Sequence, residues 1–106
     1  MFRVFTTKEF DKDFDKLSGS DKERVRKILK QLKEQGDSVG KTLGRPYFRE
    51  KKFGGKRLYF LIYKQLTIIL AVGISDKKAQ QITINKIISE IKEYERDIVK
   101  RFKQNN

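Results

Sequence analysis

The sequence has 106 residues and a formal net charge of +12, from 26 basic and 14 acidic side chains. This length supports one domain with its own core, and the content of eight Phe and four Tyr argues against a disordered chain. Cysteine and histidine are absent, which excludes disulfides, thiolate chemistry and imidazole catalysis, and no apolar run is long enough to cross a bilayer. We therefore expect a single cytoplasmic domain over residues 1–106, with no membrane association.

The first third of the chain predicts a short strand over residues 2–5 and then two helices. Each helix begins at a capping box, in which a hydroxyl side chain and an acid three positions later satisfy free amides at the helix start. The two capping boxes are Thr6–Glu9 and Ser20–Glu23. Apolar residues recur at helical spacing after each box, and Gly36 closes the second helix. Two antiparallel helices joined by a tight turn follow from this pattern.

Residues 47–74 predict three consecutive antiparallel strands, after a loop over residues 37–46. A two-residue turn at Gly54–Gly55 separates a short basic strand from a second strand over residues 56–63. The third strand, over residues 66–74, is apolar on both of its faces. That pattern is typical of a central strand that is covered on both sides.

A long helix is predicted over residues 76–103, with Ser75–Asp76 at its start and no Gly or Pro inside it. At about 1.5 Å per residue it would measure about 40 Å, which is more than a domain of this size covers. We therefore expect a partner segment or a second copy of the chain to cover its distal apolar side chains. These are Tyr94, Ile98 and Phe102.

These elements predict an α+β fold with the order β-α-α-β-β-β-α. A small antiparallel β-sheet carries the two N-terminal helices on one face, and the long C-terminal helix lies near the end of the sheet.

The positive charge is concentrated on residues 41–64, where eight basic residues face the single acid Glu50. Such a concentration predicts a surface that binds an anion, and nucleic acid is the usual partner of a basic domain. A lysine-rich solvated surface of a heat-adapted protein is the alternative explanation. The eight residues are Lys41, Arg45, Arg49, Lys51, Lys52, Lys56, Arg57 and Lys64.

Few kinds of active site are compatible with this composition. Without His or Cys, and with the acids scattered along helices, no metal site is predicted. The Gly54–Gly55 pair lacks the context of a phosphate-binding loop and is interpreted as a turn. We expect no cofactor.

Cations on rigid strands remain as the chemical resource of the chain. Arg49 and Lys51 are two positions apart on one strand and share a face, and Arg57 follows the turn within reach of that face. Together with Lys77 and Lys78 they could grip a phosphodiester and stabilise the charge that builds up on it. RNA carries its own nucleophile, the 2′-hydroxyl, so cleavage would need positioning and a weak acid and base but no metal. Binding RNA without cleaving it would require only the cations, with no acid or base in place.

The sequence resembles the RelE/ParE superfamily of toxins from type II toxin–antitoxin systems, and the RelE branch in particular. The resemblance lies in the apolar spacing of the two N-terminal helices, the strand at 47–52, the turn at 55–59 and the apolar strand that leads into Asp76-Lys77-Lys78. It implies a RelE-like fold and a metal-independent endoribonuclease that cleaves mRNA on the ribosome by 2′-hydroxyl attack. It also implies a cognate antitoxin as partner. The toxin is expected to form either a homodimer or a heterotetramer with that antitoxin.

The resemblance assigns roles by position. Arg49 and Lys51 match the strand cations that contact the phosphate, Arg57 matches the arginine that stabilises the transition state, and Lys77 matches the late basic residue. The other residues expected to contact RNA are Lys41, Arg45, Lys52, Lys56, Lys78, Gln81 and Thr83. Thr83 stands where RelE proteins carry an aromatic residue that stacks on the scissile nucleotide. A non-catalytic RNA- or ribosome-binding protein of this fold and a ParE-like topoisomerase inhibitor are the alternatives.

Overall fold

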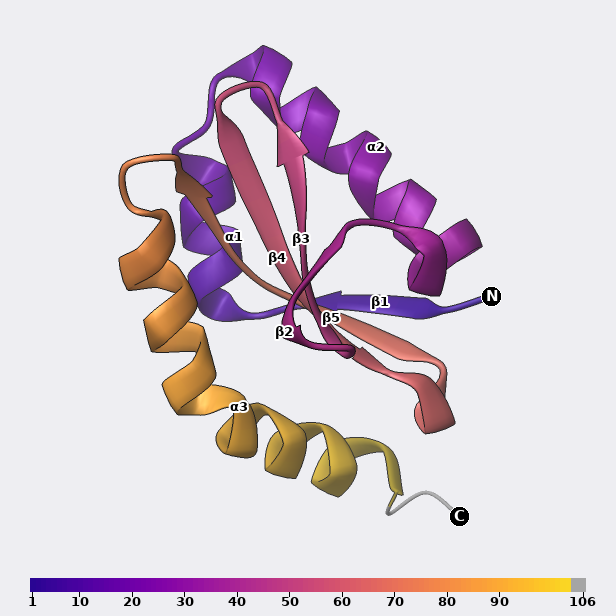
Figure 1. Ribbon diagram of the computed structural model, residues 1–106. Coiled ribbons are helices and arrows are strands. Elements are labelled where there is room, and N and C mark those ends of the chain that lie inside the picture. Colours follow the sequence, from indigo (N-terminus) through magenta and orange to yellow (C-terminus); the bar gives the residue numbers. More distant parts are fainter. Residues whose placement is uncertain (104–106) are drawn as a thin grey trace.

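A computed structural model describes residues 1–103 of the chain. Five strands form one sheet in the order β1-β5-β4-β3-β2, and helices cover both of its faces (Figure 1). The strands are β1 (Arg3–Thr6), β2 (Lys41–Arg45), β3 (Phe48–Phe53), β4 (Lys56–Tyr63) and β5 (Ile68–Asp76). The helices are α1 (Lys8–Asp15), α2 (Gly19–Gln35) and α3 (Gln80–Lys103), with short 3₁₀ turns at Gly36–Ser38 and Lys64–Leu66.

The α+β fold and the two N-terminal helices on one face of the sheet agree with the expectation from the sequence. The sheet itself differs in two ways. Residues 41–45 form the edge strand β2 instead of belonging to a loop, and β1 pairs with β5 in parallel, so the sheet is mixed. The parallel pairing is possible because two helices separate β1 from the rest of the sheet along the chain.

Both N-terminal helices begin one or two residues away from their predicted positions. Thr7, not Thr6, caps α1, because its side-chain oxygen accepts a hydrogen bond from the Phe10 amide at 3.1 Å. Ser18, not Ser20, caps α2 by accepting from the Asp21 amide at 3.2 Å. The same type of cap operates in each case, since a hydroxyl oxygen replaces the missing backbone acceptor of the first turn.

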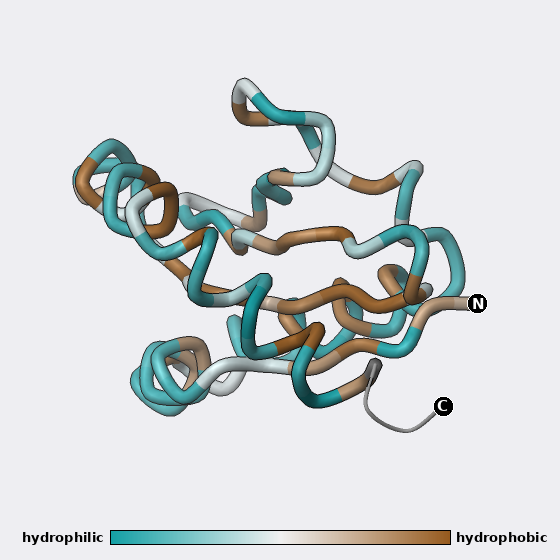
Figure 2. The backbone as a smooth tube through the Cα atoms, turned by 90° about the horizontal axis from the view of Figure 1, so that it is seen from below, coloured by the Kyte–Doolittle hydropathy of each residue, from teal (hydrophilic) through white to brown (hydrophobic). Residues whose placement is uncertain are grey.

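The core consists of two layers separated by the sheet. One layer lies between the sheet and helices α1 and α2, on what we call the α2 face. The other lies between the sheet and α3, on what we call the α3 face. Central strands β4 and β5 contribute to both layers, as the continuous apolar sequence of β5 predicts, and Figure 2 shows hydrophobic positions concentrated along these inner strands.

Helix α3 lies along the α3 face and does not overhang the sheet. It begins at Gln80, four residues later than predicted, after a turn in which Asp76 Oδ1 accepts from the Ala79 amide at 2.8 Å. Figure 1 shows the helix changing direction about halfway along its length. Ser89 lies in this middle part and its hydroxyl donates to the Lys86 carbonyl at 2.6 Å, a contact that often bends helices.

This bend brings the distal apolar side chains of α3 onto the protein's own core. Ile98 is 5% exposed, and the Phe102 ring lies 5.0 Å from the Phe5 ring of β1, measured between centroids. The expectation that a partner must cover this part of the helix is therefore wrong. It assumed a straight helix on a smaller sheet.

Replacing Ile98 by alanine tests this packing. We expect a loss of about 2 to 4 kcal/mol in the free energy of unfolding, because the substitution leaves a cavity between α3 and the sheet. Chemical denaturation of the purified chain measures the loss, and Ile82→Ala on the solvent side of the same helix, where the residue is 76% exposed, is the control. Equal stabilities of the two variants would contradict the packing.

Candidate functional site

Two adjacent rows of residues cross the sheet on the α3 face, close to the start of α3. Residues directly opposite each other on neighbouring strands point to the same face, so the strand register defines each row. The first row consists of Lys41, Glu50, Tyr59 and Gly73. The second row consists of Lys52, Arg57 and Ser75. The rows therefore bring together cations from β2, β3 and β4 around one acid.

The centre of these rows is a buried polar cluster. Glu50, Arg57 and Ser75 are 3%, 8% and 7% exposed. The Tyr59 hydroxyl lies 2.8 Å from the Ser75 Oγ. Arg57 Nε lies 3.8 Å from Glu50 Oε2. Burial raises the pKa of the Tyr59 hydroxyl, against the opposing effect of its hydrogen bond with Ser75, so this tyrosine stays protonated well into alkaline pH.

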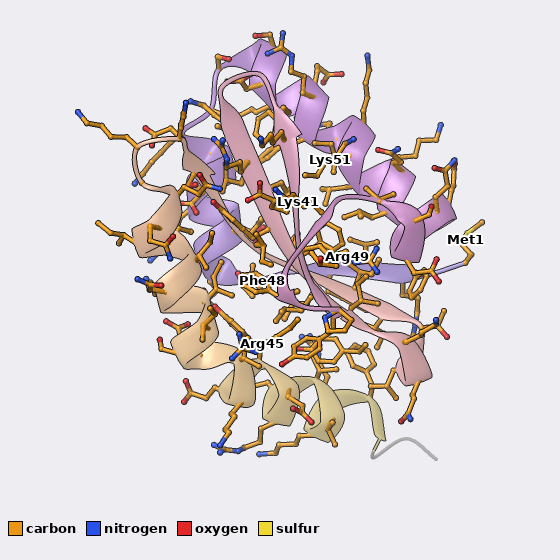
Figure 3. The ribbon with its side chains drawn as sticks, in the orientation of Figure 1. Met1, Lys41, Arg45, Phe48, Arg49 and Lys51 are labelled. Atoms are coloured by element: carbon orange, nitrogen blue, oxygen red, sulfur yellow. The ribbon has the colours of Figure 1, made fainter. Side chains whose placement is uncertain are left out.

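Three of the predicted site residues lie on the other side of the sheet. Arg49 and Lys51 share a face, as expected, but it is the α2 face, because Lys51 pairs with the core residue Leu58. Lys56 lies opposite Phe53 and belongs to the same face. Figure 3 shows Arg49 and Lys51 on the side of the sheet towards α2, and Arg45 on the side towards α3. The expectation that Arg57 joins Arg49 and Lys51 on one face is therefore wrong.

Arg49 contacts the backbone instead of an open surface. Its guanidinium donates to the carbonyl oxygen of Pro46 at 3.1 Å and to those of Asp37 and Val39. These three carbonyls belong to the segment that leads from α2 through β2 into β3. Charge-assisted hydrogen bonds of this kind hold a connection in place.

We expect Arg49→Ala to lower the free energy of unfolding by about 1 to 2 kcal/mol, because three carbonyl oxygens lose a charged donor. Lys51→Ala is the matched control, since it removes a cation from the same strand and the same face. We expect it to change stability by less than about 0.5 kcal/mol. Urea denaturation of both variants measures the difference, and equal effects would contradict the structural role of Arg49.

The remaining predicted residues lie beside the rows. Lys77 and Lys78 are exposed in the connection between β5 and α3, directly after the strand that carries Ser75. Thr83 packs on the first row, where its Cγ2 would lie 3.8 Å from a Cβ added at Gly73. Gln81 is exposed and donates to Asn85 along the helix at 3.0 Å. Arg45 is opposite Phe48, on the α3 face, one step beyond the first row.

Two residues of the cluster were not predicted from the sequence. Glu50 was counted only as the one acid among eight basic residues, and Gln80 was left out of the residues expected to contact RNA, although its neighbour Gln81 was included. Gln80 Nε2 donates to Glu50 Oε1 at 3.0 Å, so the start of α3 contacts the rows through this side chain. Alternation along β3 could have identified Glu50, because it points to the same side as the buried Phe48.

Residues 1–103 contain neither a cluster of metal ligands nor a membrane-spanning helix. In this range no group of three or more acidic side chains is placed to hold a metal ion. No helix within it is long and apolar enough to cross a membrane.

The fold is that of the RelE toxins. No protein-family model and no curated protein sequence matches the chain. Solved structures of RelE proteins match it with TM-scores of 0.62 to 0.68 in the cases compared below, at sequence identities too low to show more than a common fold.

Three structures illustrate this likeness. A free RelE toxin of E. coli with two arginines replaced by alanine has a TM-score of 0.68 and 18% identity, over 77% of this chain and 90% of that chain. The toxin–antitoxin complex RelBE2 from Mycobacterium tuberculosis has a TM-score of 0.64 and 22% identity, over 72% of this chain and 98% of that chain. The RelB–RelE complex from Methanococcus jannaschii has a TM-score of 0.62 and 15% identity, over 76% of this chain and 98% of that chain.

Proposed function

We propose that this chain is the toxin of a type II toxin–antitoxin pair, and that it is an endoribonuclease that cleaves mRNA on the ribosome without a metal ion. The observation that carries the proposal is the convergence of Lys41, Lys52 and Arg57 on one face of a RelE-type sheet, next to the start of α3. Lys77 and Lys78 flank this surface. Such a surface fits the phosphates of RNA, because strands hold the cations in place before the ligand arrives.

In the proposed reaction the 2′-hydroxyl oxygen of one nucleotide attacks the adjacent phosphorus, and the bond from phosphorus to the 5′-oxygen of the next nucleotide breaks. The products are a 2′,3′-cyclic phosphate and a free 5′-hydroxyl. Arg57 donates hydrogen bonds to the non-bridging phosphate oxygens as negative charge builds up on them. Solvent water takes up the proton of the attacking 2′-hydroxyl, and a neighbouring lysine, Lys52 or Lys77, protonates the departing 5′-oxygen.

The register of the sheet puts Arg49, Lys51 and Lys56 on the α2 face, so we propose different roles for them. Arg49 is proposed to support the fold through its contacts with backbone carbonyls, and Lys51 and Lys56 are proposed to contact more distant phosphates of the RNA. The same proposal places Arg45, Gln81 and Thr83 along the RNA on the α3 side. We propose that the protein acts in the cytoplasm and that a cognate antitoxin holds it inactive. The toxin would form a homodimer, or a heterotetramer together with the antitoxin.

The decisive experiment adds the purified chain to a cell-free translation reaction and maps the mRNA ends by primer extension. Cleavage that depends on ribosomes and leaves a 5′-hydroxyl end supports the proposal. Intact mRNA together with undisturbed translation overturns it.

RNA or ribosome binding without cleavage is the second candidate. It is favoured by Thr83, which cannot stack on a base, and by the small exposed fraction of Arg57. Blocked translation with intact mRNA in the same experiment would support this candidate.

A further inference from the structure

Apart from tyrosine side chains, the only buried polar or charged side chains among residues 1–102 are Glu50, Arg57 and Ser75, and all three belong to the two rows. Beyond the two rows, the α3 face of the sheet is covered by apolar core residues. A buried carboxylate is costly, and replacing a buried ion pair by apolar residues is often stabilising. A role in stability is therefore a weak explanation for Glu50.

The contacts of the Glu50 carboxylate connect it to two different elements. Oε2 faces Arg57 Nε on β4 at 3.8 Å, and Oε1 accepts from Gln80 Nε2 on α3 at 3.0 Å. Arg57 Nε is itself buried and has no hydrogen-bond partner in the described part of the chain. The carboxylate is thus held between a helix and an arginine whose Nε has no other partner.

We infer that Glu50 is a positioning residue that orients Arg57 towards the phosphate of bound RNA, with Gln80 fixing the carboxylate. This inference rests on the proposed function. A guanidinium is a planar fork, so an acid that restrains its Nε side also sets the direction of its two terminal nitrogens. Those nitrogens are then available for two parallel hydrogen bonds to one phosphate.

Glu50→Gln tests the inference, because glutamine keeps the size of the side chain while it removes the charge and replaces one acceptor oxygen by an amide donor. In cleavage of mRNA on programmed ribosomes we expect kcat to fall about 10- to 100-fold, as an arginine loses its orientation. KM should stay the same or fall, because the variant has one negative charge fewer and RNA is an anion. Glu93→Gln, which changes an exposed acid of α3, is the matched control and should leave both constants unchanged.

A double variant separates positioning from independent catalysis. Glu50→Gln should cost nothing further in a chain that already carries Arg57→Ala, since Glu50 acts through Arg57. Additive losses in the double variant, or an unchanged kcat in Glu50→Gln, would overturn the inference. Gln80→Ala leaves both charges in place, and we expect an intermediate loss of kcat from it even if Glu50→Gln folds poorly.

A measurement without RNA keeps this test separate from that of the proposed function. Hydrogen exchange of the Arg57 Nε–H, followed by NMR, should become faster in Glu50→Gln and stay unchanged in Glu93→Gln. If the wild-type chain fails to cut RNA but this exchange responds, the proposed function fails and the positioning of Arg57 stands. An unchanged exchange rate in Glu50→Gln would overturn the positioning.

Discussion

Arg57→Ala is expected to lower the rate of RNA cleavage about 100- to 1,000-fold, which is the usual effect of removing one donor that stabilises charge in a transition state. Arg57 is the one cation of the two rows that is buried, and it lies between Lys52 and Ser75 across the sheet. A fixed donor in a site of low dielectric interacts more strongly with developing charge than an exposed lysine does. Single-turnover cleavage of ribosome-bound mRNA by the purified variant measures the effect.

Lys56→Ala is the matched control for this prediction. Lys56 is the neighbour of Arg57 in the sequence and carries the same charge, but it points to the α2 face. We expect its replacement to weaken RNA binding slightly and to leave the cleavage step unchanged. Arg57→Lys should recover only part of the rate, because lysine lacks the forked donor. If Lys56→Ala and Arg57→Ala lowered the rate equally, the assignment of the site to the α3 face would be contradicted.

The division of the cations between two faces could have been derived from the predicted turn. A two-residue turn at Gly54–Gly55 places Phe53 opposite Lys56, and therefore Lys52 opposite Arg57. Because successive side chains of β3 point to opposite faces, Lys52 and Lys51 lie on different faces of the sheet. The sequence prediction treated the arginine after the turn as reachable from the Lys51 face, which neglected this register.

Elements with strong local patterns were predicted well. The bounds of β4 are those expected, because turn residues and alternating large side chains define them. Strand β2 was missed because its sequence, KTLGR, has a single large apolar residue and a glycine. Such a strand forms at the sheet edge through backbone pairing with β3, which local composition does not encode.

The contacts made over long distances in the sequence were the hardest to predict. The Gln80–Glu50 hydrogen bond and the Phe5–Phe102 contact both depend on where α3 begins and on how it bends across the sheet. The Asp76 cap indicated a helix start, but not the turn of three residues before Gln80. The buried acid at position 50 therefore seemed to be a surface charge until its neighbours were known.

Gly40→Ala is expected to lower the free energy of unfolding by about 2 to 5 kcal/mol, a large part of the 5 to 15 kcal/mol that is typical of a domain. Gly40 has a φ of +81°, which strains any residue with a Cβ. In addition, an added Cβ would lie 2.6 Å from the Glu50 carbonyl oxygen and 3.2 Å from the Phe60 ring. Neither can move freely, since β3 pairs with β4 at Glu50 and Phe60 belongs to the core.

Gly44→Ala separates the backbone strain from the steric clash. Gly44 also has a φ of +81°, but no atom lies within 4 Å of an added Cβ there. We expect it to cost only the backbone strain, about 1 to 2 kcal/mol. Urea denaturation of both variants gives the two values, and equal losses would mean that the close approach to Glu50 is absent. Because the obstructing atom belongs to Glu50, any relief of the clash in Gly40→Ala moves β3 at the acid that faces Arg57. The same variant should therefore lose cleavage activity under conditions where it is still folded, whereas Gly44→Ala should retain it.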